Sequence, residues 1–512
     1  MNYRLARILI VSAACAAGLT GFSYLLVHDP AAELAVHLPG MDARPPEGVH
    51  ESFEVTIGES FQVFDGSPSA VTAVWPRFRG AFMDNINREP TALASSFAPG
   101  EPPILWSVEL GEGYAGAAVA NGRVYVLDYD EERQADALRC FSLDDGRELW
   151  RRWYTTRLKR NHGISRTVPA VTERYVVTIG PNCHVMSTDA LSGELLWGID
   201  LVERYGVEVP LWYTGQCPLI DEGFGTGGLA AEPGDELGRD AGKPPARPQA
   251  VIAVGGTVLM IGVDLATGEV LWETPNPEGY AMSHSSVMLM ELAGTRTYVY
   301  AAIGAILGVS AEPESAGTLL WSTTGFDATV IAPSPVQVGD DRVFQAAGYG
   351  AGSIMLQIEP GTRPVAATPG NPLVPGLAVR TLYRHRPIEG LSSEQQTPIL
   401  YRGHLFGILP KDAGALRGQF ACWHPDGRLI WSSGEDRRFG LGPYLLADGK
   451  FYLLQEDGVL LVVEAGLQGF RPLGSARILD GPDPWAPLAL AGGRLLARDT
   501  RRMVCVDLRA KE

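Results

Sequence analysis

Imidazole, thiol, phenol, amide and guanidinium side chains gather in a few short segments of the sequence, where they could bind a ligand or a metal ion. These candidate rim or funnel residues are His162, Arg166, Cys183, His184, Tyr213, Gln216, Cys217 and His284. Imidazole and thiolate groups brought together bind zinc or copper, so His162, His184 and His284 are weak metal candidates. The alternative is that these side chains hydrogen-bond to loop backbone or fill a channel, because they lack the tight spacing of a metal motif. No catalytic residue is assigned.

An internal repeat reveals the elements that must position these side chains. Five segments, among them DALSGELLW and DLATGEVLW, place a glycine four residues before a tryptophan. The composition would supply about one such pair by chance, so five in a shared context form a repeat. The pairs are Gly146 and Trp150, Gly193 and Trp197, Gly268 and Trp272, Gly317 and Trp321, and Gly427 and Trp431. We expect each glycine in a tight turn at positive φ, and each tryptophan on an outer strand that covers the gap to the neighbouring sheet.

Short apolar strands, often introduced by a proline such as Pro169, Pro335 or Pro443, precede these hairpins. Four short strands in about 45 residues are typical of a propeller blade. Eight units are predicted, with outer strands near Trp106, Trp150, Trp197, Trp272, Trp321, Tyr383, Trp431 and Pro472. The predicted fold class is therefore all-β, an eight-bladed propeller of four-stranded antiparallel blades.

The two ends of the propeller are predicted to close on each other. Residues 104–110 resemble an outer strand with no blade before it, whereas the chain ends on the third strand of its last blade. We expect this N-terminal strand to complete the last blade, which leaves no unpaired edge between the first and last blades. A Gly/Pro-rich stretch at about 221–249 is expected to form a flexible surface insertion.

Residues 1–30 differ from the rest, because Arg4 and Arg7 precede an almost uncharged run from Ile8 to Val27. Such a run is long enough to span a bilayer as a helix, and the charges around it place the amino end in the cytoplasm. We expect a single-pass membrane anchor; a cleaved signal peptide and a lipoprotein site at Cys15 are the competing interpretations. All three export the rest of the chain. Residues 31–74 are interpreted as a Pro/Gly-rich tether with a short hairpin around 53–64, and residues 75–512 as the propeller.

Composition excludes several classes of protein. With 46% hydrophobic and 20% charged residues, the chain is a folded globular protein and not a disordered one. It carries 42 basic and 59 acidic residues, a net charge of −17, so no nucleic-acid partner is expected. Of the six cysteines, Cys140, Cys422 and Cys505 fall on predicted third strands, where buried free thiols are expected.

The D-x-x-T-G-x-x-x-W core of the repeat resembles the unit of propellers built from pyrroloquinoline quinone (PQQ) repeats, the quinoprotein alcohol dehydrogenase-like superfamily. The resemblance covers about residues 75–509, and WPRFRG at 75–80 is similar to the first segment of the PQQ-binding-like group found in planctomycetes. It implies the propeller fold, but the same architecture serves dehydrogenases and scaffolds. The enzymes hold calcium beside the quinone and often carry two adjacent cysteines, a pair that this sequence lacks.

Two functions remain from this reasoning. The first is a membrane-tethered, extracytoplasmic propeller in the periplasm, similar in role to the PQQ-repeat lipoprotein of the outer-membrane assembly machinery. It would bind a protein or peptide at one face, without a cofactor and without catalysis. The alternative is an oxidoreductase that uses PQQ with calcium, or another metal ion, in the central funnel near His162, His184 and His284. A stacking aromatic with several convergent carboxylates would favour the enzyme.

Overall fold

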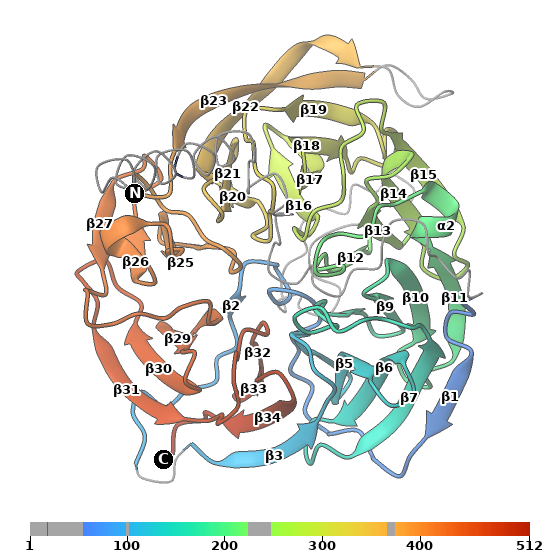
Figure 1. Ribbon diagram of the computed structural model, residues 1–512, viewed down its shortest axis with the longest axis vertical. Helices are drawn as coiled ribbons and strands as arrows, with labels where there is room; N and C mark the ends of the chain where they lie inside the picture. Colours follow the sequence, from blue (N-terminus) through green and yellow to red (C-terminus); the bar gives the residue numbers. More distant parts are fainter. Residues whose placement is uncertain (1–17, 19–54, 99–101, 224–246, 366–373, 512) are drawn as a thin grey trace, which may run out of the picture. The chain divides into compact units, whose positions relative to one another are not determined.

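Eight β-sheets surround a central axis in the computed structural model of the protein (Figure 1). The structure describes Gly18 and residues 55–98, 102–223, 247–365 and 374–511. The eight sheets belong to one unit, Glu51–Glu512, and Met1–His50 form another. The predicted anchor at residues 1–30 lies outside the described residues, Gly18 excepted. Within the described parts, no helix is both long and apolar enough to cross a membrane.

In the first seven blades the four main strands follow one another in chain order from the axis outwards, and neighbouring main strands are antiparallel. Blades one to four contain β4 (Ala118–Ala120), β5 (Arg123–Asp130), β6 (Ala135–Ser142), β7 (Glu148–Thr155); β8 (Ala170–Val171), β9 (Tyr175–Ile179), β10 (His184–Asp189), β11 (Leu195–Asp200); β12 (Leu219–Asp221), β13 (Gln249–Ala253), β14 (Val258–Asp264), β15 (Val270–Pro275); and β16 (Met288–Leu292), β17 (Thr295–Ala302), β18 (Ala305–Ser310), β19 (Leu319–Thr323). A short helix, α2 (Leu201–Tyr205), follows the second blade, and the predicted insertion joins β12 to β13.

Blades five to eight complete the ring. They contain β20 (Val336–Val338), β21 (Arg342–Ala347), β22 (Gly352–Val365), β23 (Val374–His385); β24 (Ile399–Tyr401), β25 (His404–Ile408), β26 (Phe420–Trp423), β27 (Leu429–Ser432); β28 (Tyr444–Ala447), β29 (Lys450–Leu454), β30 (Val459–Glu464), β31 (Pro472–Arg477); and β32 (Ala489–Ala491), β33 (Arg494–Arg498), β34 (Arg502–Asp507), β3 (Ile104–Glu109). A 3₁₀ turn, η1 (Gly414–Leu416), lies in the sixth blade. The prediction of eight four-stranded blades is confirmed, and the fifth and seventh blades, which lack the outer tryptophan, are regular. Strands β22 and β23 form a long hairpin that extends beyond the other blades (Figure 1).

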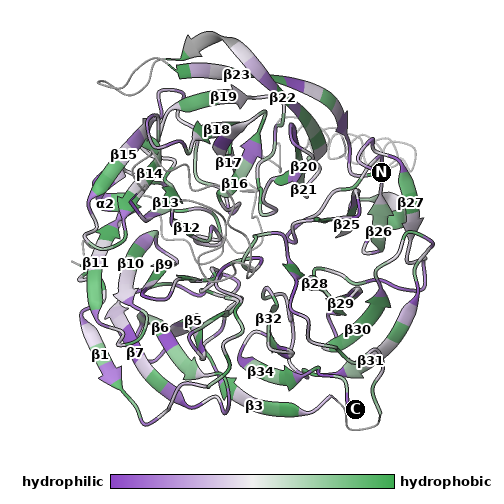
Figure 2. Cartoon of the chain, turned by 180° about the vertical axis from the view of Figure 1, so that it is seen from behind, coloured by the Kyte–Doolittle hydropathy of each residue, from purple (hydrophilic) through white to green (hydrophobic). Residues whose placement is uncertain are grey.

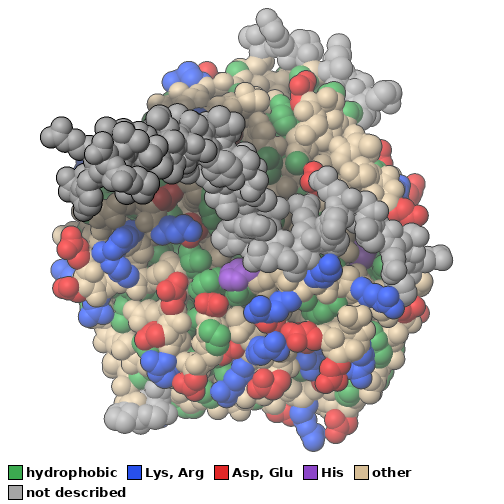
Figure 3. Space-filling model, in the orientation of Figure 1, with side chains coloured by type: hydrophobic (Ala, Val, Ile, Leu, Met, Phe, Trp, Pro, Cys, Tyr) green, Lys and Arg blue, Asp and Glu red, His purple; other side chains and the backbone are tan. Residues whose placement is uncertain are grey.

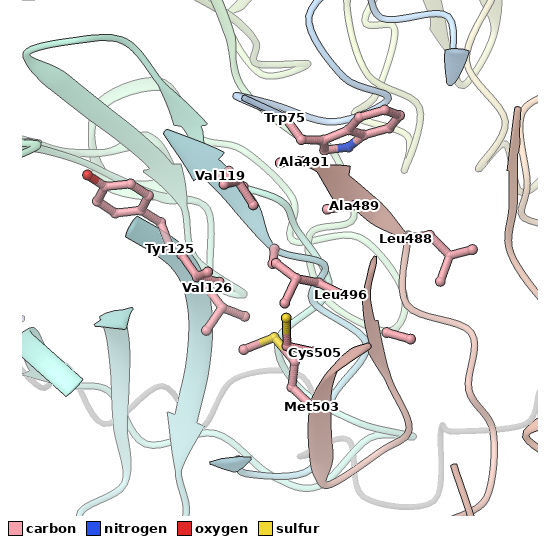
Figure 4. Packing of buried hydrophobic residues seen from close by; sticks show 14 of the residues in the cluster. Trp75, Val119, Tyr125, Val126, Leu488, Ala489, Ala491, Leu496, Met503 and Cys505 are labelled. Atoms are coloured by element: carbon pink, nitrogen blue, oxygen red, sulfur yellow. The ribbon is translucent and has the colours of Figure 1, made fainter. Parts of the chain in front are cut away.

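Closure of the ring by the N-terminal strand is also confirmed. Strand β3 pairs antiparallel with β34, with Val108 opposite Met503. Trp75 lies beside Val119 of the first blade and Ala491 of the last (Figure 4), and its backbone exchanges two hydrogen bonds of 2.8 Å with Val119. The indole ring is 2% exposed and belongs to one apolar cluster with side chains from both blades. The junction between the first and last blades, which we call the seam, is thus stabilised by hydrophobic burial as well as by strand pairing.

The segment from Trp75 to residue 89 runs along the inner strands. Besides Trp75, its bonds reach β8 through Pro76, β12 through Arg77, the residues before β24 through Arg79, β28 through Asn85, and β32 through Asn87. Within it, β2 (Ile86–Asn87) adds in parallel to the inner edge of β28. The inner strands of five blades and the residues just before the inner strand of the sixth therefore bond to this channel segment. Among the described residues, it makes no hydrogen bond to the inner strands of blades four and five.

The hairpin expected around 53–64 is corrected by the structure. Strand β1 (Ser60–Val63) pairs antiparallel with β7, so it extends the first blade to five strands. Its partner is the outer edge of a sheet, which offers unpaired backbone groups to any extended segment nearby. The residues of β1 are thus attached to the outer edge of the first blade at β7, and they are not a free tether at this point.

Hydrophobic residues dominate the middle of the blades, as in β30, where Leu460, Leu461, Val462 and Val463 are all buried (Figure 2). Both faces of such a sheet contact neighbouring blades, which explains the continuous apolar run. The surface seen in Figure 3 mixes acidic and basic side chains and shows no large area of one sign.

Candidate functional site

Loops that lead into the inner strands carry most of the aromatic side chains at one end of the channel. Tyr114, His162, Trp212, His284 and Trp485 precede β4, β8, β12, β16 and β32 respectively, and Tyr349 lies in the turn between β21 and β22. In an antiparallel blade, the loop before the first strand and the turn between the second and third strands lie at the same end. We call these six residues the aromatic rim. The channel segment bonds farther along the inner strands, and Ser69 reaches Gly122 beyond β4, at the opposite end.

The aromatic rim consists of two groups of rings. In the first group, the ring of Tyr114 stacks on Trp485 at 5.4 Å between centroids, and His162 lies 5.8 Å from each of them. In the second group, Trp212 stacks on His284 at 6.2 Å and lies 6.0 Å from Tyr349. These are ordinary distances for favourable aromatic contacts, so each group is held by its own packing.

Arg166 connects the two groups. Its Nε donates a 2.6 Å hydrogen bond to the carbonyl oxygen of Trp212, and its Nη2 donates bonds of 2.6 and 3.1 Å to the carbonyls of His162 and Gly163. The guanidinium lies over the Tyr114 ring, 5.1 Å from its centroid. Its side chain is half-buried, and burial lowers the pKa of Arg166 to about 10, which leaves it charged at neutral pH.

Several residues at this end of the channel have left-handed backbone conformations. His162, Trp212, Tyr213 and Tyr349 have φ values of 58°, 66°, 69° and 54°, and Asp483 near Trp485 has 51°. Such left-handed conformations are uncommon for residues other than glycine and cost of order 1–3 kcal/mol each. Strained residues persist where surrounding contacts fix them, and they cluster at functional sites. Three of the six rim side chains are presented in this way.

Charges at the aromatic rim are set by burial. Burial and the nearby Arg166 guanidinium lower the pKa of His284 to about 4, so its ring is neutral at physiological pH. The same two causes lower the pKa of His162. Burial raises the pKa of Tyr114 to about 12, which keeps its phenol protonated. Arg166 is therefore a cation in contact with both groups of rings, and a second cation, the ammonium of Lys411, lies 5.2 Å from the centroid of the Tyr349 ring.

The remaining predicted site residues lie beneath or beside the rim. Tyr213 donates a 2.6 Å hydrogen bond to the carbonyl of Lys159, and Gln216 is buried with its amide bonded to both backbone groups of Ala253. Cys183 contacts the Thr214 hydroxyl at 3.0 Å. The sulfur of Cys217 accepts a hydrogen bond from the backbone of Val168. These groups bond to loops and neighbouring blades and do not face a common cavity.

His184 is the first residue of β10. Its Nε2 lies 3.4 Å from a carboxylate oxygen of Asp200, and its ring meets Tyr154 edge-on at 5.4 Å. The Tyr154 hydroxyl donates a 2.8 Å bond to Asp136, whose pKa burial raises to about 7. His184 thus belongs to a buried polar cluster between the first two blades.

The three histidines proposed as metal candidates have different partners, since His162 packs on Tyr114, His184 on Tyr154 and His284 on Trp212. Across the described residues, no three or more His, Cys, Asp and Glu side chains form a group that could hold a metal ion. A calcium-bound quinone needs several convergent oxygen ligands beside a stacking aromatic. The rim supplies the aromatics but, as far as it is described, not that ligand set, so its residues do not fit this cofactor.

Sequence reasoning missed Tyr114, Trp212, Tyr349 and Trp485. A usable signal was present, because each stands in a short Gly- or Pro-containing segment: GYAG, LWYTG, GYGAG and DPWAP. Loop aromatics that cannot join a core strand are candidates for a binding surface.

A hollow lies elsewhere, beside the channel segment at blades four to six. Its volume is about 390 Å³, and its lining includes Phe82, Met83, Met288, Met290, Val336 and Leu400. It was not predicted from the sequence. Its lining differs from the rim, because methionine and aliphatic side chains outnumber its single aromatic ring, that of Phe82.

Comparison with known proteins gives the family. The family model described as outer membrane protein assembly factor BamB matches residues 87–215 and 232–395, more than half of the chain. No curated protein matches the chain. Among solved structures, BamB from Moraxella catarrhalis is similar at 12% identity with a TM-score of 0.48, covering 79% of this chain and 99% of that one. A quinohemoprotein alcohol dehydrogenase from Pseudomonas putida HK5 is similar at 13% identity with a TM-score of 0.41, covering 86% and 81%.

The repeat unit, the eight closed blades and the family match agree with one another. The match spans the first five blades, where four of the five glycine–tryptophan pairs lie. The chain belongs to the family of PQQ-repeat propellers whose model is described as outer membrane protein assembly factor BamB.

Proposed function

We propose that this protein is a membrane-tethered, extracytoplasmic scaffold that binds a protein or peptide partner at the aromatic rim, without catalysis. The observation that carries the proposal is the bridging of two aromatic groups by Arg166, on loops in strained conformations. Loops on a rigid propeller are suited to recognition, and aromatic and arginine side chains dominate the energetics of protein interfaces. The BamB family description supports a role in assembly.

The membrane tether in this proposal rests on the apolar run Ile8–Val27 and its flanking charges. Protease added to intact spheroplasts tests it, because a propeller outside the cytoplasmic membrane is digested and a cytoplasmic one is protected. Protection from the protease would contradict the extracytoplasmic location.

Site-specific cross-linking tests the binding site. The photoreactive residue p-benzoylphenylalanine is placed at Tyr349, which is 42% exposed, and as a control at Leu191, which is 51% exposed in the turn between β10 and β11. We expect a discrete cross-linked product from Tyr349 and none from Leu191 when the full chain is irradiated in its native cells. No product at either position, or the same product at both, would contradict a partner at the rim.

The melting temperature of the full chain tests the alternative function, an oxidoreductase that uses PQQ with calcium or another metal ion. A ligand that binds only the folded state raises the melting temperature. PQQ added with Ca²⁺, and Zn²⁺ or Cu²⁺ added alone, should leave the melting temperature of the full chain unchanged. A clear increase with PQQ and Ca²⁺ would favour the oxidoreductase.

A further inference from the structure

Arg166 differs in its partners from most of the other buried or half-buried arginines. Arg139 is paired with Asp128 and Glu148 at 2.9 Å, and Arg296 with Asp221 at 2.6 Å. Three further arginines, Arg79, Arg152 and Arg498, bond to carbonyl oxygens, but each is at most 9% exposed and closed to ligands. Arg166 also bonds to carbonyls, yet it remains half-buried, and no carboxylate lies within ion-pair distance of it among the described residues.

One nitrogen of this guanidinium is available to a ligand. Nε and Nη2 are occupied by the carbonyls of Trp212, His162 and Gly163. Nη1 donates no hydrogen bond to the described residues, and it is not among their buried polar atoms that lack a partner. A desolvated cation with a free donor binds a carboxylate through a strong, charge-assisted hydrogen bond.

The surroundings restrict what can carry that carboxylate. The guanidinium of Arg166 lies over the ring of Tyr114, which stacks on Trp485. Its Nε bonds to the carbonyl of Trp212, whose ring lies 6.0 Å from that of Tyr349. A ligand that covers both groups therefore has flat or apolar side chains on both sides of its acidic group. A polyacidic partner is disfavoured, because the chain carries a net charge of −17.

We infer that the aromatic rim recognises an extended peptide segment in which a single aspartate or glutamate is flanked on both sides by aromatic residues. This rests on the proposed function and specifies its ligand. The carboxylate binds at Nη1 of Arg166, and the flanking side chains pack on the two aromatic groups. Recognition thus depends on one charged contact, between the ligand carboxylate and Arg166.

The test uses the purified full chain and short dye-labelled peptides, acetylated and amidated so that their ends carry no charge. The probe has aspartate at its centre and phenylalanine on either side; two matched probes carry asparagine at the centre or alanine at the flanks. Fluorescence anisotropy should show at least tenfold weaker binding for each matched probe. Equal binding of the aspartate and asparagine probes, or no binding of any probe, would overturn the inference.

Variants of the protein test whether Arg166 is the residue that selects aspartate over asparagine. R166Q should abolish the preference for aspartate over asparagine, whereas Y349A should weaken both probes and keep the preference. The matched control is R402Q, because Arg402 is an exposed arginine that also lies 5.1 Å from a tyrosine ring, that of Tyr401, in the turn between β24 and β25. R402Q should bind like the wild type, and a preference that survives in folded R166Q would overturn the inference.

If R166Q fails to fold, the comparison of the aspartate and asparagine probes on the wild type still decides the outcome. The experiments distinguish failure of the proposed ligand class from failure of the proposed scaffold function. Loss of charge preference with a retained cross-link at Tyr349 would overturn the ligand class and leave the scaffold, whereas loss of the cross-link would overturn the scaffold itself.

Discussion

The indole ring of Trp150, on the outer strand of the first blade, lies against Gly193 in the outer turn of the second blade. A Cβ atom built at Gly193 would come within 2.6 Å of Cδ2 of Trp150. The same relationship joins Trp106 to Gly146, Trp197 to Gly268 and Trp272 to Gly317. The glycine and tryptophan of each repeat therefore contact different neighbours, and the repeat is a device for joining successive blades.

Replacing Gly193 with alanine should destabilise the protein by about 2–4 kcal/mol, because the methyl group meets the indole and the backbone has positive φ. Gly279 is the control, with φ of +69° and no atom within 4 Å of a built Cβ. Its alanine variant should lose only about 1 kcal/mol from backbone strain. Thermal unfolding of both variants measures the difference, and equal losses would contradict the contact between blades.

Asp136 should make the fold less stable as pH rises. Burial raises its pKa to about 7, whereas the unfolded carboxyl titrates near its usual value, so between these pH values only the unfolded chain releases the proton. Stability falls across about pH 4 to 7, by up to about 4 kcal/mol.

Denaturant unfolding of Asp136→Asn and of the wild type at several pH values checks this. The variant gains relative stability as pH rises, because asparagine removes the cost of ionisation but still accepts the bond from Tyr154. Asp340→Asn, at an exposed position, should follow the wild type. A constant difference between Asp136→Asn and the wild type would contradict the raised pKa.

The titration of His284 has the opposite effect, because it makes the fold less stable as pH falls. Its pKa is lowered to about 4 in the folded protein, so between that value and the usual one near 6.5 only the unfolded chain takes up the proton. Its contribution to stability is complete above about pH 6.5 and declines as the medium is acidified, by about 2 kcal/mol for a half-buried ring. His284→Phe, which keeps the stacking on Trp212, should remove this acid sensitivity in the same unfolding measurements. If His284→Phe and the wild type lost stability identically in acid, the lowered pKa of His284 would be refuted.

The described cysteines should react with a thiol reagent only after unfolding. Cys140, Cys183, Cys217, Cys422 and Cys505 are all buried and unpaired, and burial raises the pKa of Cys183 to about 12 and that of Cys217 to about 11. Buried thiols of high pKa are inert. Colorimetric titration of the native protein should miss these five groups, and denaturant without reductant should expose them. Fast labelling of Cys183 or Cys217 in the native protein would show that the rim opens.

The fold was predictable because the hydrophobic and turn signals recur. Glycines such as Gly146 and tryptophans such as Trp150 identify each unit, and the unpaired strand around Trp106 indicates how the ring closes. The site was predictable only in part. His162, Arg166 and His284 were found, but their partners Trp212 and Trp485 come from other blades, and only the closed ring brings them together.

The attachment of β1 to β7 was also beyond the sequence, since an exposed strand pairs with any accessible edge and its own residues do not specify which one. The route of the channel segment was missed for a related reason. Its bonds from Arg77, Arg79 and Asn85 go to carbonyl oxygens, which every residue provides.

Strand β3 is synthesised before the first blade, whereas its partner β34 is synthesised only after the strands of the other seven blades. The first blade can form early, but its neighbour across the seam is not yet present, and Trp75 has only half of its packing site. The ring can therefore close only after β34 has been made. A chain truncated before Arg502 would lack β34 and would expose both halves of the seam to proteases and chaperones.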